Sequence, residues 1–171
     1  MTLRHIRETH KTTRPDIVMA NTYSQIHIQM VFAVKYRQAL ILPSFKDRLH
    51  DYITAIVQNH DHKMLAINSV EDHIHFLMGF RPHESISNLI RQVKGDSSEW
   101  INKEKLTPKT FRWQEGYGAF SYAKSDIPNV IRYITNQEAH HRQQTFLEEY
   151  IGLLDTFRIE YDPAYIFKPP A

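Results

Sequence analysis

The 171-residue sequence contains no cysteine, which excludes disulfide bonds and thiolate metal sites. Any bound metal must therefore use histidine, carboxylate or amide ligands. No run comes near the roughly 20 apolar residues that a membrane-spanning helix needs. The first residues also lack the apolar core of a signal peptide. We therefore expect a cytoplasmic protein.

Charge of either sign is not in large excess, because the formal net charge is +2. The basic side chains are nevertheless concentrated before residue 143, and residues 143–171 are acidic. A mildly basic body permits contact with nucleic acid. Ordinary solvated surface charge explains the same distribution equally well.

The length and apolar content suit one domain with one core, which we place at residues 19–171. Residues 1–18 alternate charged and polar groups, and we expect a disordered extension there.

Apolar periodicity predicts the order of the first elements. Residues 25–34 alternate in the manner of a strand, and residues 64–70 and 73–79 are typical of a hairpin. Helical spacing follows what resembles a capping box in residues 43–60, and recurs in residues 85–102.

The second half of the chain continues the alternation of strand and helix. Residues 111–123 suggest a bent fourth strand or a bulged pair of strands. Ser125 is expected to cap a long third helix, and residues 157–161 alternate again. The order strand, helix, hairpin, helix, strand, helix predicts an α+β fold. We expect a ferredoxin-like or RRM-like sandwich with a mostly antiparallel sheet and a C-terminal catalytic helix.

His73-Ile74-His75 lies inside a predicted strand, where residues two apart point to the same face. Two imidazoles placed in this way can share one metal ion, although core histidines with ordinary hydrogen bonds would give the same pattern. A second triplet, at His60 and His62, lies at a predicted helix end, where the side chains should diverge. We interpret the second triplet as a polar turn.

The third helix carries Tyr133 and Gln137 one turn apart on a polar stripe. Tyr52 and Tyr150 also have helical surroundings, but the residues four positions after them are apolar and cannot bind metal. An amphipathic tyrosine with its ring on the core remains an alternative for Tyr133.

Together these residues resemble the single-tyrosine HUH transposases, TnpA-like enzymes of small bacterial insertion sequences that move as single-stranded DNA. The name HUH denotes His, hydrophobic residue, His. The resemblance extends in matching order from about Asn21 onward, and it rests on residues 72–76 and 133–137, with 35–37, 89–95, 113–121 and 140–141 in support.

The resemblance implies a transposase in a bacterial or archaeal cell that cleaves single-stranded DNA at hairpin-flanked element ends. Tyr133 would be the nucleophile and form a 5′ phosphotyrosine intermediate. His73, His75 and Gln137 would hold Mg²⁺ or Mn²⁺. These three ligands are neutral, so no carboxylate is expected in the site.

Four basic residues are candidate contacts to the DNA backbone: Arg91, Lys94, Arg112 and Lys124. The resemblance also implies a homodimer whose sites are shared between subunits, with residues 123–126 as a plausible hinge.

Two other classes of function remain open. One is a non-catalytic regulator that binds DNA or RNA hairpins on the same fold. The other is a metal-dependent hydrolase that uses water, in which Tyr133 would be dispensable.

Overall fold

Four strands form one antiparallel sheet in the order β2-β3-β1-β4 in a computed structural model that describes residues 23–166. The strands are β1 Ile26–Ala33, β2 Lys63–Ser69, β3 His73–Phe80 and β4 Gly118–Tyr122. Each adjacent pair is antiparallel. The ferredoxin-like α+β expectation is confirmed, whereas the extension expected at residues 1–18 lies outside the described residues.

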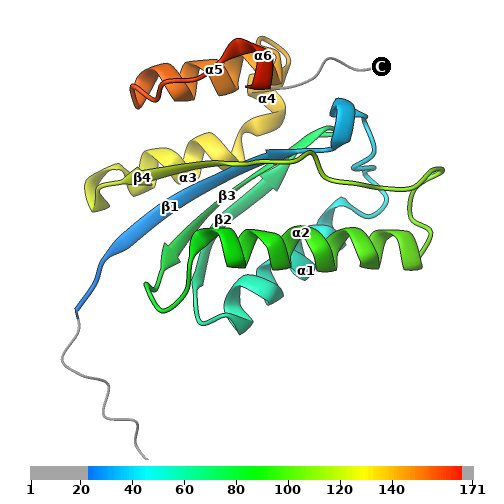
Figure 1. Ribbon diagram of the computed structural model, residues 1–171, viewed down its shortest axis with the longest axis horizontal. Coiled ribbons are helices and arrows are strands. Elements are labelled where there is room, and N and C mark those ends of the chain that lie inside the picture. The colour runs from blue at the N-terminus through cyan, green and yellow to red at the C-terminus, as the bar shows by residue number, and fades with distance from the viewer. Residues whose placement is uncertain (1–22, 167–171) are drawn as a thin grey trace, which may run out of the picture.

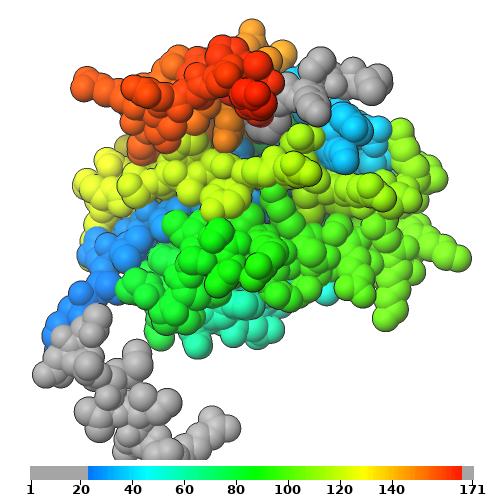
Figure 2. Space-filling model, in the orientation of Figure 1, coloured from blue at the N-terminus to red at the C-terminus, as the bar shows by residue number. Residues whose placement is uncertain are grey.

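Helices cover both faces of this sheet (Figure 1). One face carries α1 Lys46–Asn59 and α2 Ile86–Lys103. The opposite face carries the later helices, which are α3 Ile127–Thr135, α4 Gln137–His141, α5 Phe146–Thr156 and α6 Pro163–Ile166. Figure 2 shows α5 and α6 as an orange-to-red layer beyond the yellow-green β4. Single turns at η1 Lys35–Arg37 and η2 Lys124–Asp126 join strand to helix.

Strand alternation divides β3 between the two layers. Ile74, Phe76 and Met78 belong to the main apolar core, which includes buried residues of α1 and α2. His73 and His75 point to the other face, toward α3, α4 and α5. The strand therefore contributes apolar side chains to the core on one side and imidazoles on the other.

Two of the expected helix starts are wrong and one is confirmed. Ser85 caps α2, because its Oγ accepts a hydrogen bond of 3.1 Å from the backbone N–H of Asn88. The α1 helix instead begins after Phe45 without a side-chain cap, and Ser125 lies inside η2.

The expected long third helix is also wrong, because the chain leaves helical geometry at Asn136 (φ −94°, ψ 20°) and α4 begins at the next residue. Asn68 supports this break, since its side-chain amide donates hydrogen bonds of 3.0 Å to the carbonyls of Ile134 and Thr135. Carbonyls in the last turn of a helix lack partners within the helix, and Asn68 helps to satisfy these two.

Residues 111–123 form a shorter strand than expected. Only β4 is regular, and Trp113 makes an isolated bridge to Val34. Gly116 lies between them at φ 81°, a conformation that other residues rarely adopt.

The predicted strand-like run at residues 157–161 is wrong, since these residues follow α5 without forming a strand. Thr145 caps α5 through a capping box with Glu148.

Within residues 23–166, no helix combines the length and apolar character required to span a bilayer.

Candidate active site

The two histidines of β3 lie side by side beneath the helical layer. His73 and His75 are fully buried, and their rings are 5.1 Å apart at an interplanar angle of 75°. The Nε2 atoms of both rings are buried without a hydrogen-bond partner among the described residues. Buried polar atoms usually have such partners, so this pair is suited to binding something else.

The opposite ring nitrogen of each histidine is held by a neighbouring side chain. His73 Nδ1 lies 2.7 Å from Asp72 Oδ1, so its N–H donates to the carboxylate and the lone pair of Nε2 faces inward. His75 Nδ1 lies 2.9 Å from the amide nitrogen of Gln29, and Gln29 Oε1 accepts a hydrogen bond of 2.7 Å from the Tyr122 hydroxyl. Turning the Gln29 amide over would give His75 the same inward lone pair.

Helices α3 and α4 bring Tyr133 and Gln137 to this pair. The ring of Tyr133 stands edge-on to His75 with centroids 5.8 Å apart, and Gln137 is fully buried. The polar stripe predicted for Tyr133 and Gln137 is therefore not exposed to solvent at Gln137. The four residues singled out in the sequence nevertheless meet at one place.

A carboxylate that was not expected lies at the centre of the site. Glu149 of α5 is 5% exposed. Its Oε1 accepts hydrogen bonds from the Tyr133 hydroxyl and from the Gln137 amide, the latter of 3.0 Å. Its Oε2 accepts from His141 Nε2 at 2.9 Å and lies 3.5 and 3.4 Å from the Nε2 atoms of His73 and His75. A carboxylate is therefore present in a site where none was expected.

The titratable groups of this cluster shift one another's pKa values. Burial alone would raise the pKa of Glu149, but its contacts with His73 and His75 lower it to about 2. Burial opposes the charged form of His73, yet the carboxylates of Asp72 and Glu149 raise its pKa. Burial lowers the pKa of His75, and burial together with the charge of His73 lowers that of His141 to about 4.

The sequence carries a signal that could have located Glu149. Thr145 and Glu148 have the spacing of a capping box, which indicates a helix from residue 146, although no helix was predicted there. On that helix Glu149 shares a face with Phe146 and Tyr150, both buried. A carboxylate among apolar residues on one helical face needs a partner.

The candidate DNA contacts do not form one group. Arg91, Lys94 and Arg112 line a cleft of about 500 Å³ between α2 and the loop before β4, whereas Lys124 lies in η2. Lys94 is partly buried and donates to the carbonyls of Gln114 and Gly116. Burial lowers the pKa of Lys94 to about 8.

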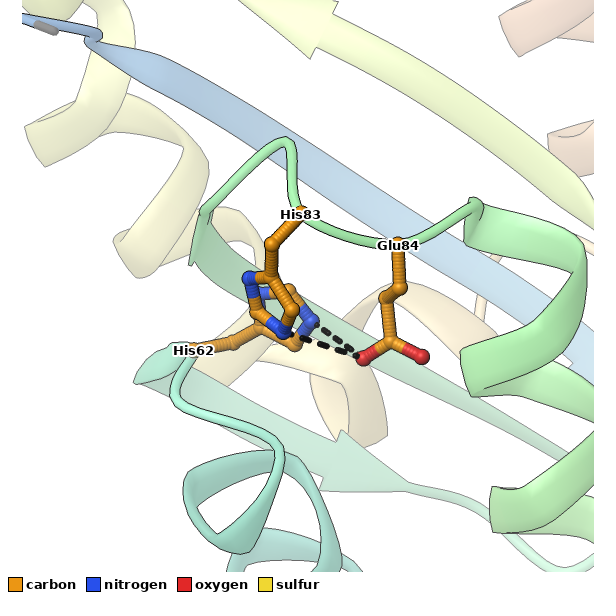
Figure 3. A group of neighbouring side chains, drawn as sticks. All are labelled: His62, His83 and Glu84. Atoms are coloured by element: carbon orange, nitrogen blue, oxygen red, sulfur yellow. Dashed lines mark hydrogen bonds and ion pairs between the residues drawn. The ribbon is translucent and has the colours of Figure 1, made fainter. Parts of the chain in front are cut away.

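A second histidine cluster lies where β2 begins and the loop from β3 enters α2 (Figure 3). His62 is buried, so the polar-turn interpretation is wrong for this side chain. The rings of His62 and His83 stack 5.0 Å apart, and Glu84 Oε1 lies 2.9 Å from His62 Nε2 and 2.9 Å from His60 Nδ1. The two side chains of the His60 triplet therefore converge on one carboxylate rather than diverge.

Hydrogen bonding argues against a metal at this second cluster. The backbone N–H of Arg81 donates to His62 Nδ1 at 3.0 Å, so the proton of the neutral ring sits on Nε2 and is donated to Glu84. A neutral imidazole ligates through its unprotonated nitrogen. His62 already uses that nitrogen to bind the backbone, and the cluster ties the loop to the sheet.

Comparison with known proteins identifies the family. Residues 22–137 match the family model described as "Transposase IS200 like", which is more than half of the chain. The chain belongs to this family. The matched span includes both histidines of β3, Tyr133 and Gln137, and it ends before Glu149. The function of this IS200-like protein is therefore transposition, and it is a DNA-cleaving enzyme.

Individual relatives agree with the family and with the fold. The ISDra2 transposase TnpA of Deinococcus radiodurans is 23% identical over 119 residues, which are 66% of this chain and 84% of the relative. A crystal structure of a transposase candidate from Deinococcus radiodurans R1 superposes with a TM-score of 0.56 at 20% identity, covering 69% of this chain and 95% of the other. The structure of a REP-associated tyrosine transposase bound to a REP hairpin superposes with a TM-score of 0.55 at 14% identity. The superposition covers 71% of this chain and 72% of the other.

Proposed function

We propose that this transposase is an HUH-type nuclease and strand transferase that cleaves single-stranded DNA with Tyr133 as nucleophile, at hairpin-flanked element ends. The observation that carries the proposal is the meeting of Tyr133 and Gln137 with two buried imidazoles whose Nε2 atoms have no hydrogen-bond partner among residues 23–166.

The metal site of this proposal comprises His73, His75 and Gln137. The two free Nε2 atoms fit a divalent ion, and Asp72 fixes the orientation of the His73 ring. The Gln137 amide oxygen would join them after a rotation of the amide, because its nitrogen now faces Glu149. Bound Mg²⁺ or Mn²⁺ would offset negative charge that develops on the phosphate oxygens.

Tyr133 would attack the phosphorus of a phosphodiester. The new bond joins its oxygen to phosphorus while the bond from phosphorus to the 3′ oxygen breaks, which leaves a 5′ phosphotyrosine and a free 3′ hydroxyl. The tyrosine loses one proton and the 3′ oxygen gains one. Because the reaction exchanges one phosphodiester for another, rejoining needs no external energy source.

A cleft of about 440 Å³ gives access to Tyr133 from the side of β4. It is lined by residues of β4, α3 and α5, including Tyr122, Asn129 and Phe157. Aromatic side chains at such a cleft can stack on unpaired bases. The cleft therefore suits a single strand better than a duplex.

Incubation with single-stranded DNA from the element ends and Mn²⁺ tests the proposal. A covalent protein–DNA adduct that survives denaturation is expected, with Tyr133 as the modified residue by mass spectrometry. Chelation of the metal should abolish it. Hairpin binding without any adduct would instead favour a non-catalytic regulator.

The matched control is Tyr133→Phe, which removes one hydroxyl and its hydrogen bond to Glu149. We expect loss of cleavage and adduct by at least about 10³-fold, since the nucleophile itself is removed. Hairpin affinity should stay within a factor of about two. Cleavage at the wild-type rate would show that water is the nucleophile and the enzyme a hydrolase.

A homodimer with shared sites is part of the proposal. In one chain the β3 histidines already meet Tyr133, so exchange would place the same contacts between subunits. The turn η2 is the segment at which α3 would cross, because it lies between β4 and α3 and its residues are exposed.

A further inference from the structure

Glu149 is the one acidic side chain among the described residues that touches both metal-binding imidazoles. Its Oε2 lies 3.5 Å from His73 Nε2 and 3.4 Å from His75 Nε2. Charge-assisted N–H···O⁻ hydrogen bonds are shorter, at about 2.7–2.9 Å. Both Nε2 atoms are left without a hydrogen-bond partner among residues 23–166. These separations therefore need another explanation.

Binding of all three atoms to one metal ion would account for these separations. Two donors bound at about 2.1 Å are separated by about 3.0 Å in octahedral and about 3.4 Å in tetrahedral coordination. The two distances from Glu149 Oε2, 3.5 and 3.4 Å, lie at the upper end of this range, and the three donor atoms lie within 4.8 Å of one another. Two imidazoles and one carboxylate are also a frequent ligand set for divalent metals.

The charge balance of the site leads to the same conclusion. No lysine or arginine among residues 23–166 forms an ion pair with Glu149, and its ion pairs are all with histidines. A carboxylate that is 5% exposed needs a compensating positive charge. A divalent ion between the imidazoles and Oε2 would supply it in place of the proton that Asp72 and Glu149 favour on His73.

We propose that Glu149 is a ligand of the metal at His73 and His75, through Oε2, and that its Oε1 positions the hydroxyl of Tyr133. One carboxylate would thus connect the metal to the nucleophile. The inference rests on the metal site of the proposed function and adds to it a ligand from α5, beyond the span that matches the family. The ligand set then carries a negative charge.

Binding of Mn²⁺ to the protein without DNA, measured by isothermal titration calorimetry, tests the role of Glu149. In Glu149→Gln we expect the dissociation constant for Mn²⁺ to rise at least about tenfold, since a charged ligand is lost. The substitution keeps the side-chain shape, and circular dichroism should show an unchanged fold.

The matched control is Glu84→Gln. Glu84 also lies against histidines, but its neighbour His62 is committed to the backbone of Arg81. We expect its Mn²⁺ affinity to stay within a factor of about two of wild type. Tyr133→Phe should likewise keep Mn²⁺ affinity while losing the adduct.

Wild-type Mn²⁺ affinity in folded Glu149→Gln would overturn the ligand role, and faster cleavage by that variant would show that Glu149 instead blocks the site. If Glu149→Gln does not fold, Co²⁺ loaded into Glu149→Ala gives a second measurement, because alanine has no carboxylate to bind the ion. A visible spectrum identical to wild type in that variant would also overturn the proposal. A failed adduct assay with intact metal binding would count only against the tyrosine mechanism.

Discussion

At the scale of single residues, the site depends on side chains that orient its two imidazoles. Asp72 does so for His73, and Gln29 does so for His75 from the neighbouring strand β1. Gln29 is fully buried and is itself held by the Tyr122 hydroxyl. Such partners fix the tautomer and the ring position of a metal ligand.

Gln29→Leu should weaken Mn²⁺ binding and cleavage by about 10–100-fold, because it removes the hydrogen bond to His75 and leaves the imidazole unsupported. Calorimetry and cleavage rates would measure the loss. The exposed Gln25, just before β1, provides a control, and Gln25→Leu should behave as wild type. Equal metal affinity in both variants would remove Gln29 from the site.

His73→Ala or His75→Ala should abolish metal-dependent cleavage and lower Mn²⁺ affinity, because each removes one of the two buried imidazoles that we propose as metal ligands. In contrast, His60→Ala should leave both quantities unchanged, since His60 contacts Glu84 at the far end of the sheet. Both measurements are made on purified protein at equal metal concentration.

His62 requires a separate expectation. It is buried against Phe80, with rings stacked 4.6 Å apart, and it accepts the Arg81 N–H. His62→Ala should therefore lower the melting temperature while metal affinity stays normal. A loss of Mn²⁺ affinity in that variant would contradict our assignment of the metal to the site at His73 and His75.

At the scale of elements, α1 is attached to the end of β2 by a titratable contact. His50 Nε2 lies 2.8 Å from the hydroxyl of Ser69, and burial together with the charge of Lys46 lowers the pKa of His50 to about 4. The folded state therefore keeps this imidazole neutral where the unfolded chain would protonate it.

The lowered pKa of His50 makes the stability of the fold depend on pH. The contribution of neutral His50 to the free energy of unfolding is fully present above pH 6.5 and is lost as pH falls from 6.5 toward 4, because the unfolded state binds the proton first. His50→Gln does not titrate, so its free energy of unfolding should fall less between pH 7 and pH 5, by about 1 kcal/mol after discounting for solvent. Urea denaturation at the two pH values measures this difference. An equal fall in the free energy of unfolding for wild type and His50→Gln would contradict it.

At the scale of the whole molecule, the question is whether a site is built within one chain or between two. Mixing inactive His75→Ala protein with inactive Tyr133→Phe protein distinguishes them. A dimer that exchanges α3 should recover about a quarter of wild-type cleavage, since half of randomly assorted dimers are mixed and each has one complete site of two.

Verified subunit exchange without rescue, or a monomeric mass by light scattering, would show that each chain builds its own site. The arrangement in a single chain, with His75 and Tyr133 in ring contact, would then be the working one.

The sequence alone determined the strands of the sheet and the shared face of the two imidazoles, because these depend on local periodicity. Alternation in β3 already places His73 and His75 on one face. The meeting of Tyr133 with Gln137 does not follow from one continuous helix, since the chain leaves helical geometry at Asn136 between them. The break at Asn136 was missed because Asn68, on β2, supplies the partner for the exposed carbonyls.

Only the tertiary structure placed Glu149 in the site and His62 in the core. Helix α5 packs on the sheet through Phe146, Tyr150 and Leu154, and this packing inserts the carboxylate between residues of β3 and α3. The convergence of His62 on Glu84 likewise joins two segments distant in sequence. Periodicity within one element specifies which face a side chain occupies, whereas its partners across the face depend on how separate elements pack together.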